Sequence, residues 1–539
     1  MDTQRTLLAV VLSIIVLVLY EQWMAPKPTH PAAAPTAATQ SATAKPAPAP
    51  TTAMATAPST SATAPTMSGT ATSGLASPAE LAAAPSVPFA TQVYQGSVSL
   101  LGGDIVHLGL KHYPTSSSDK APYPILSPES ARLTLQQSGF RALDGQILQG
   151  RYRLLRDTGH ALVLQGEAGP LRIEKTLEFA PDSYLIHEII RVTNGGSSDW
   201  NGSYLDQILR NDRSESHWFM SIFTGAVLMH NGSFSEKSFS DLRSHPEEWS
   251  GSGWAGMTDH YFLEAILPEP KATGQIYARA AGPNSVAGVA VALPRLAPGQ
   301  STTIEQDLYL GPKEQKTLSS LGRGLEQTVD YGWFAIIAEP MHGVLSWFHS
   351  WTGNWGLAIV LLVLAVKILF FYPSAISYRS MANMRKLQPK LEQIKKQYGE
   401  DRQKMGAAMM ELYRSEKVNP MAGCLPIVIQ MPVFIALYWV LVESVSLRMA
   451  PFVLWIHDLA APDPYFILPL LMGVSMFIQQ RLNPAPMDPM QKKILSALPV
   501  IFAIFFSFFP AGLVLYWLTN NVVSIAQQYL ITRHVMKEV

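Results

Sequence analysis

The spacing of apolar residues changes several times along the chain, and each change predicts a different kind of structure. Residues 7–24 are almost entirely apolar, with Arg5 before them and Lys27 after. This run is close to the minimum of about 17 residues for a membrane span. A cleavable signal peptide and an uncleaved anchor both fit it. We favour an anchor over residues 1–25 with a cytoplasmic N-terminus, because no small-x-small cleavage site directly follows.

The next two stretches read as a tether and a β-rich domain. Residues 26–88 are mostly Ala, Thr, Pro and Ser, which predicts a disordered tether. Residues 89–325 instead show short period-two runs, as in 171–179, 184–193 and 286–293, separated by turn signals such as 102–104 and 194–196. Many short strands with polar turns predict a large all-β sandwich. The sandwich follows an anchor whose N-terminus is expected in the cytoplasm. The chain therefore crosses the membrane before the sandwich begins, which places the sandwich in the periplasm.

Within residues 326–352, the stretch 333–351 is aromatic and apolar but is interrupted by Glu339, Pro340 and Gly343. This composition predicts a helix lying in the membrane interface, where aromatic rings prefer to sit.

Five apolar segments follow, so the fold class predicted is a polytopic α-helical membrane protein. The segments are 355–372, 425–445, 466–477, 494–509 and 512–531. Together they form a helical core over residues 353–539, and with the anchor they make six spans and two cytoplasmic termini. Lys and Arg outnumber Asp and Glu in residues 379–417, which places that loop in the cytoplasm by the positive-inside rule.

This basic loop, residues 374–418, reads as an αα-hairpin. Apolar residues recur at helical spacing in each half, Gly399 offers a stop, and Asp401 can cap a second helix. Methionines stand in both halves and give an adaptable surface; the alternative is that they simply pack the hairpin. They are Met381, Met384, Met405 and Met409.

Composition and motifs argue against several function classes. Acidic and basic residues balance, so no nucleic-acid partner is expected. The single cysteine, Cys424, excludes an internal disulfide. The sequence has no phosphate loop, no Gly-x-Ser-x-Gly and no His-Glu-x-x-His. We therefore expect no catalytic residue, no metal and no cofactor.

The polar residues within the apolar segments are the strongest candidates for function, because polarity at membrane depth is costly. Lys367 is surrounded by apolar neighbours, although it could also extend to the cytoplasmic surface. Tyr516, Asn520 and Gln527 share one face of the last segment, and Gln430 adds an amide in the third span. An adjacent strip holds Trp517, Asn521, Ser524 and Gln528. The absence of a deep carboxylate weighs against an ion-coupled transporter.

Short motifs along nearly the whole chain resemble the Gram-negative YidC membrane protein insertases. They are GGD at 102–104, TVDYGW at 328–333, GNWG at 353–356, KVNP at 417–420, QMP at 430–432, LWIHDL at 454–459 and GLVLY at 512–516. The resemblance implies a five-helix insertase core with a cytoplasm-open hydrophilic groove, and a periplasmic β-supersandwich similar to mutarotase folds. The family's groove cation, commonly arginine, corresponds to Lys367. Its aromatic pair corresponds to Tyr516 and Trp517.

Two sets of site residues follow, the first from helical spacing together with the resemblance and the second mainly from the resemblance. The groove would be lined by Lys367, Gln430, Tyr516, Trp517, Asn520 and Gln527. The transmembrane helix of the protein being inserted, which we call the client, would contact Met431, Phe434, Ile435 and Ile504.

The expected function is insertion and folding of proteins in the cell inner membrane, without covalent chemistry or nucleotide hydrolysis. Expected partners are nascent membrane proteins, the lipid bilayer, the Sec translocon, and also the ribosome and the signal recognition particle receptor. Two alternatives remain. One is a translocon-associated scaffold or holdase without insertion activity. The other is a periplasmic sugar-acting enzyme that works through the β-domain.

Overall fold

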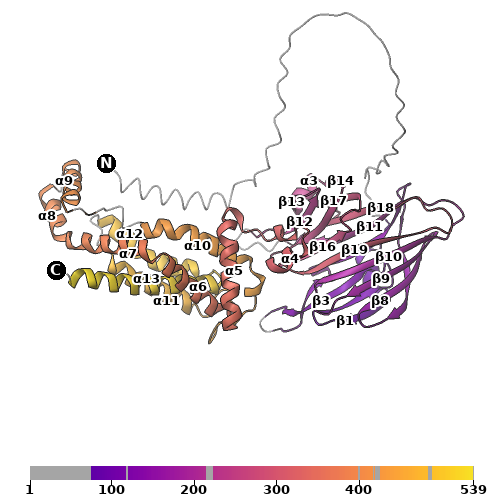
Figure 1. The fold of residues 1–539 in the computed structure, drawn as a ribbon, viewed down its shortest axis with the longest axis horizontal. Helices are drawn as coiled ribbons and strands as arrows, with labels where there is room; N and C mark the ends of the chain where they lie inside the picture. The colour runs from indigo at the N-terminus through magenta and orange to yellow at the C-terminus, as the bar shows by residue number, and fades with distance from the viewer. Residues whose placement is uncertain are drawn as a thin grey trace, which may run out of the picture. The chain divides into compact units, whose positions relative to one another are not determined.

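The computed structural model describes residues 74–116, 119–213, 222–398, 401–416, 418, 425–483 and 489–537. The predicted anchor and most of the predicted tether lie outside these residues. Figure 1 shows the strands gathered in one part of the molecule and helices α5 to α13 in another. We call these parts the β-domain and, from α6 onward, the helical core.

Regular structure begins before the predicted end of the tether, so that boundary is wrong. Helix α2 (Pro78–Ala83) and strand β1 (Ser86–Ala90) both begin within residues 26–88. Ser77 and Glu80 form a reciprocal capping box at the start of α2, and Leu81 is buried. These two local signals, a cap and an apolar anchor, stand out against the surrounding Ala and Pro.

Three antiparallel sheets make up the β-domain. The four-stranded sheet runs β1-β2-β3-β4; its other strands are β2 (Tyr94–Ser99), β3 (Ile105–Pro114) and β4 (Pro122–Leu126). The nine-stranded sheet has the order β13-β12-β15-β16-β19-β10-β9-β8-β7. Its members are β7 (Arg151–Asp157), β8 (Ala161–Ala168), β9 (Leu171–Phe179), β10 (Leu185–Asn194), β12 (Gly225–His230), β13 (Ser233–Ser238), β15 (Gly253–Thr258), β16 (Phe262–Pro268) and β19 (Ser301–Pro312).

The six-stranded sheet has the order β14-β17-β18-β11-β5-β6. Its strands are β5 (Thr134–Ala142), β6 (Ile147–Leu148), β11 (Gly202–Asn211), β14 (Glu247–Gly251), β17 (Gly274–Ala281) and β18 (Asn284–Ala292). Short helices α3 (Phe239–Ser244) and α4 (Gln315–Leu321) lie between and after the strands. The prediction that this region is rich in β-strands is confirmed, and the region also contains these two short helices.

Alternation along the strands explains why the sheets pack face to face. In β9 the odd-numbered residues are buried, and most of the even-numbered residues, such as Arg172 and Glu174, are exposed. Residues from all three sheets then join one apolar core, which includes Leu108 of β3, Leu177 of β9 and Ile208 of β11. Burying one face of each sheet is the main stabilising term of such a fold.

Helix α5 (Ala335–Thr352) follows two short 3₁₀ turns, at Leu325–Thr328 and Gly332–Phe334, and occupies the region predicted to lie in the interface. Trp351 and Ile336 are exposed on it, whereas Ala338 and Leu345 are buried. Gly353 ends the helix in the left-handed conformation and donates its N–H to the His349 carbonyl. Glycine adopts this conformation without the penalty that a side chain brings.

The helical core consists of α6 (Trp355–Leu369), α7 (Phe371–Lys386), α8 (Gln388–Tyr398), α9 (Arg402–Ser415), α10 (Leu425–Glu443), α11 (Ile467–Leu482), α12 (Pro489–Phe506) and α13 (Ala511–Lys537). Helix α13 packs against α6, α7, α10 and α11. It is therefore the element through which side chains of the other helices can meet.

Several predicted limits in this core differ from the structure: α11 continues to Leu482 instead of ending at 477, and α12 begins at Pro489 instead of 494. The segment predicted as 355–372 ends at Leu369, and α7 begins at Phe371 after a bend of 70°. Pro373 explains the break, because proline is tolerated in the first turn of a helix but not in its interior. The first hairpin helix is also split, between α7 and α8, near Pro389.

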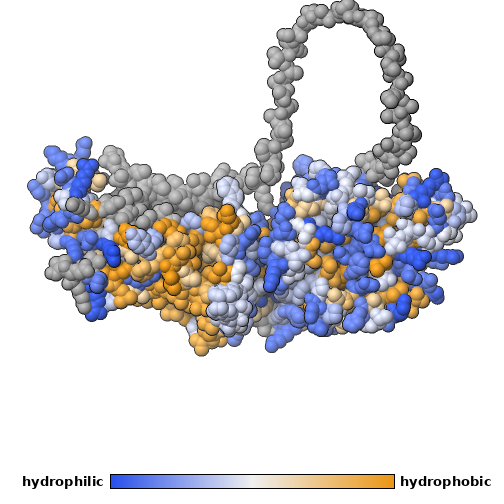
Figure 2. Space-filling model, in the orientation of Figure 1, coloured by the Kyte–Doolittle hydropathy of each residue, from blue (hydrophilic) through white to orange (hydrophobic). Residues whose placement is uncertain are grey.

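Hydropathy within the described residues gives one candidate membrane crossing by length and composition. No single described helix is long and apolar enough to cross a membrane alone. The bent pair α6–α7 is long and apolar enough when its two helices are taken together. Shorter apolar helices lie at Ile429–Glu443, Ile467–Leu482 and Lys493–Phe506. Figure 2 shows hydrophobic surface concentrated over the helical core, while the β-domain presents a mixed and largely polar surface.

Candidate functional site

Lys367 lies in the last turn of α6 and turns toward α13. Its side chain is only 8% exposed, and Nζ donates a hydrogen bond of 2.8 Å to Ser524 Oγ of α13. Ser524 Oγ in turn donates to the Asn520 carbonyl at 2.6 Å. The ammonium thus points into the helix bundle, toward α13.

A second polar contact joins α10 to α13. Gln430 Nε2 donates to the Tyr516 hydroxyl at 2.8 Å. Phe434, one turn after Gln430, stacks near the Tyr516 ring and makes an edge contact with Trp517, with ring centroids 4.6 Å apart. Trp517 also lies 5.1 Å from the Phe506 ring of α12. Four of the predicted groove and client-contact residues therefore form one cluster.

The two strips of polar residues on α13 have different surroundings. Asn521 Nδ2 donates to Ser475 Oγ at 3.0 Å, and Gln528 Nε2 donates to Asn483 Oδ1 at 3.0 Å. These bonds fasten the second strip to α11 and the residue after it. On the first strip, Asn520 Oδ1 and Gln527 Oε1 are buried and accept no hydrogen bond from any residue that the structure describes.

The groove residues predicted from the sequence are thus only partly brought together. Lys367 meets Ser524 of the second strip, a partner that the sequence did not single out for it. Tyr516 is 3% exposed, and its hydroxyl accepts the hydrogen bond from Gln430. Asn520 and Gln527 are half-buried, and their side-chain oxygens have no donor among the described residues. The arrangement provides a cation and two amide acceptors along one side of α13, and these residues include no acid–base pair.

The four predicted client-contact residues differ in exposure. Met431 is 38% exposed and Ile504 is 63% exposed, whereas Phe434 and Ile435 are half-buried. The first two are among the exposed large hydrophobic residues of the helical core.

The predicted methionines of the hairpin lie on two different elements. Met405 and Met409 are half-buried on α9, which packs against α8, and Asp401 caps α9 as predicted. Met381 and Met384 belong to α7, which continues from the α6 bend. Met410, which the sequence did not single out, is 52% exposed.

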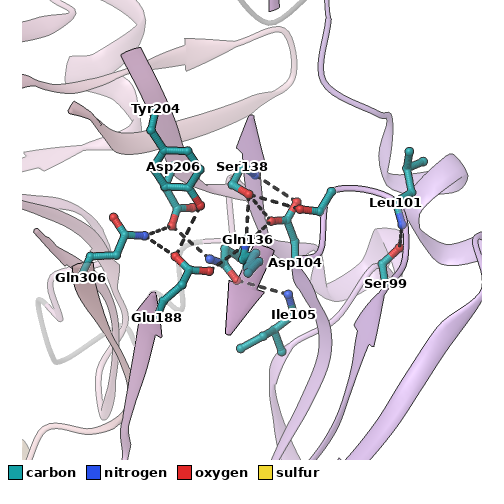
Figure 3. A network of polar contacts seen from close by, with 12 residues as sticks. Ser99, Leu101, Asp104, Ile105, Gln136, Ser138, Glu188, Tyr204, Asp206 and Gln306 are labelled. Carbon is teal, nitrogen blue, oxygen red and sulfur yellow. Dashed lines mark hydrogen bonds and ion pairs between the residues drawn. The ribbon is translucent and has the colours of Figure 1, made fainter. Parts of the chain in front are cut away.

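The β-domain contains a dense cluster of charged and polar side chains between its sheets (Figure 3). Lys175 Nζ lies 2.7 Å from Glu188 Oε1 and 3.3 Å from Asp104 Oδ1. Gln306 Nε2 bridges Glu188 and Asp206 at 2.5 and 2.6 Å. Burial, followed by repulsion from Glu188, raises the pKa of Asp206 well above its usual range.

This cluster resembles an active site in composition but lacks access. Asp104, Lys175, Glu188 and Asp206 are all buried within the sandwich, so no sugar could reach them without opening the sheets. A separate surface cavity of about 380 Å³, lined by residues such as Ser97, His107 and Glu129, contains none of the four. The cluster is therefore a buried polar network that helps to set how the sheets pair.

Comparison with known families assigns both parts of the chain. Residues 86–344 match the model of the YidC periplasmic domain, and residues 347–538 match that of the 60Kd inner membrane protein. The two matches meet at α5, between the β-domain and the helical core.

Individual relatives agree over most of the length. A membrane protein insertase YidC from Nitrosococcus oceani is 45% identical over 82% of this chain and 84% of its own. The protein of that name from Methylobacillus flagellatus is 39% identical over 99% of this chain and 97% of its own. A crystal structure described as an active YidC insertase with its first transmembrane domain resolved covers 82% of this chain and 92% of its own, at 18% identity and a TM-score of 0.38.

Proposed function

This chain belongs to the YidC family of membrane protein insertases, and we propose that it lets client segments enter the membrane along the polar side of α13. It is an inner membrane protein with a periplasmic domain, and it acts on nascent membrane proteins in the bilayer. The observation that carries the proposal is the position of Lys367. Its ammonium is held inside the helix bundle by Ser524 of α13, the helix that also carries amide oxygens without a partner among the described residues.

The physical difficulty of insertion is the client's polar outer segment, which must cross a layer of low dielectric constant. Peptide and side-chain polar groups cost several kcal/mol each when they are left without hydrogen bonds in hydrocarbon, by rough transfer scales. Asn520 Oδ1 and Gln527 Oε1 would accept bonds from such groups. Lys367 would attract acidic residues of the segment. Together they would shorten the apolar path that the segment has to cross.

The apolar surface then gives the client's transmembrane helix a way into the lipid. Met431 on α10 and Ile504 on α12 are exposed, and Phe434 and Ile435 lie beside Met431 on α10. Removing apolar area from water contributes about 25 cal/mol per Å². This transfer is the proposed driving force, and the proposed mechanism includes neither nucleotide hydrolysis nor a covalent step.

The proposal includes a topology. The anchor, α6 and α10 to α13 would make six spans with both termini in the cytoplasm, and α8 and α9 would form a cytoplasmic hairpin. The excess of Lys and Arg in residues 379–417 supports this orientation. The exposed Met410 on α9 is a suitable contact for apolar client segments. The Sec translocon, the ribosome and the signal recognition particle receptor are proposed as partners because the chain belongs to the YidC family.

The test is insertion by the purified protein in liposomes, with two short single-span clients that differ only in whether the translocated segment is acidic or neutral. Lys367→Arg should insert both clients, because it keeps the charge. Lys367→Glu should impair the acidic client several-fold and leave the neutral client nearly unchanged. Equal insertion of the acidic client by wild type and Lys367→Glu would refute the role of the cation. No insertion by the wild type alone would favour a translocon-associated scaffold.

A further inference from the structure

We propose that Ser524 is the positioning residue for Lys367, and that its hydroxyl keeps the ammonium at α13. The inference rests on the role proposed above for Lys367 in receiving acidic client segments. A lysine at the end of an apolar helix has an alternative position in the lipid interface, so its ammonium must be held at α13.

The hydrogen bonds around Ser524 fix the direction of its hydroxyl. Oγ donates its one hydrogen to the Asn520 carbonyl at 2.6 Å, so its lone pairs are left to accept. Lys367 Nζ of α6 donates to one of them at 2.8 Å. The Ser524 hydroxyl therefore connects α6 to α13.

This arrangement fixes the position of the Lys367 ammonium and leaves some of its hydrogen-bond donors available. An ammonium has three donors, and the bond to Ser524 takes one of them. Ser524 lies between Asn520 and Gln527 along α13, at spacings of four and three residues, so it is on the same side of the helix as both. Lys367 Nζ therefore reaches α13 on the side that carries Asn520 and Gln527, whose side-chain oxygens, like Gln528 Oε1, have no partner among the described residues.

Removing the hydroxyl would leave the charge in the protein but release its position. Lys367 lies in the last turn of α6, next to the bend at Phe370, and its four-carbon stem can turn toward the end of the helix. In Ser524→Ala the ammonium loses its acceptor on α13. The protein should then behave toward acidic clients like one whose cation has been moved, although no charge has been changed.

Ser475 provides a matched control on α11. It is 5% exposed against 3% for Ser524, and its Oγ also donates to a carbonyl of its own helix, that of Met472 at 2.6 Å. It also accepts one hydrogen bond from a second helix, from Asn521 Nδ2 at 3.0 Å. Ser475→Ala therefore removes an equivalent buried hydroxyl from an α11–α13 contact that does not include the cation.

The experiment compares Ser524→Ala, Ser524→Thr, Ser475→Ala and Lys367→Glu in liposomes, each with the acidic and the neutral client. Hydrogen bonds to charged groups are the stronger ones, so Ser524→Ala should lower the ratio of acidic to neutral insertion by roughly three- to tenfold. Ser524→Thr keeps the hydroxyl and should restore the ratio. Ser475→Ala should leave the ratio at the wild-type value.

The outcomes distinguish a failure of the positioning role of Ser524 from a failure of the proposed role of Lys367. If Lys367→Glu leaves the ratio unchanged, the role of the cation itself fails. If Lys367→Glu lowers the ratio but Ser524→Ala behaves like Ser475→Ala, only the positioning role of Ser524 is overturned. An equal loss for both clients in Ser524→Ala, with no rescue by threonine, would show a merely structural serine and also overturn it. Should Ser524→Ala fail to accumulate, Ser524→Cys keeps the side-chain volume with a weak acceptor, and a wild-type ratio there would overturn the inference.

Discussion

Gln430 and Tyr516 connect α10 to α13 through a single hydrogen bond, in which the amide Nε2 donates to the phenolic oxygen at 2.8 Å. Tyr516 is buried, so its hydroxyl meets Gln430 and not solvent. The bond lies beside the stacked rings of Phe434 and Tyr516. It thus joins the helix that carries Met431 to the helix that carries the polar strip.

We expect Tyr516→Phe to destabilise the protein by about 1 kcal/mol, because it leaves the Gln430 amide without its acceptor. Gln430→Leu should cost a similar amount. The double variant should cost less than the sum of the two, since neither partner is then left unpaired. The measurement is the thermal unfolding midpoint of purified full-length protein in one detergent. Strict additivity would show that the two side chains are not coupled.

The sequence predicted which residues of α10 and α13 are polar, but not which neighbour each one meets. Helical spacing places Tyr516, Asn520 and Gln527 on one strip, and the structure agrees. The rotation of α13 against α6 and α11 depends on the packing of whole helices, and no local pattern specifies it. For that reason Ser524, on the adjacent strip, was not identified as the partner of Lys367.

In the β-domain the sequence does show that one charged side chain, Lys175, must have a buried partner. The alternation in β9 places Lys175 on the same buried face as Ile173 and Leu177, so its charge requires a buried partner. The carboxylates that satisfy it, Glu188 and Asp104, come from other parts of the chain. The need for a partner could be read from the sequence, but its identity depended on strand pairing.

Glu264 should make the stability of the β-domain depend on pH. Burial is the largest cause that raises its pKa, to about 8, and it outweighs the attraction of Arg210. In the unfolded chain the pKa is about 4.3. The folded state therefore holds the proton more tightly, and stability should fall as pH rises from about 4.5 to about 8, by at most about 1.4 kcal/mol per pH unit.

The variant that tests this is Glu264→Gln, which keeps an oxygen for Arg210 Nη1 but cannot ionise. The unfolding midpoint should fall less between pH 5 and pH 8 in Glu264→Gln than in the wild type. The two proteins should be closest at pH 5, where the wild-type carboxyl is protonated in the folded state. Parallel curves across this range would assign the pH dependence to other groups.

Gly473 sets how closely α11 approaches α12. A Cβ at this position would lie 2.9 Å from Ala503 Cβ and 3.2 Å from the Pro499 carbonyl oxygen. Small residues allow such close helix packing in membranes. Gly473→Leu should therefore destabilise the protein by about 1–3 kcal/mol through overpacking.

Gly406 of α9 gives the control for this substitution, since a Cβ there meets no atom within 4 Å. Gly406→Ala should be neutral or stabilising by up to about 1 kcal/mol, because alanine favours helix. Both variants are compared by unfolding midpoint in the same detergent. An unchanged midpoint for Gly473→Leu would mean that α11 and α12 separate without cost.

The route of the client can be mapped with a photo-crosslinker placed at single positions of the full-length protein. Met431 and Ile504 are exposed and apolar, so both should capture a stalled nascent transmembrane segment. Tyr516 is buried, and it should capture less than Met431 unless α10 and α13 separate.

Val522 is 52% exposed on α13 but lies about 200° around the helix from Asn520, so it controls for chance contact through lipid. Asn231, exposed at a β-hairpin turn, should capture little. Crosslinks from Val522 as strong as those from Met431 would remove the preference for one face, and strong crosslinks from Asn231 with none from Met431 or Ile504 would show that clients do not use the helical core.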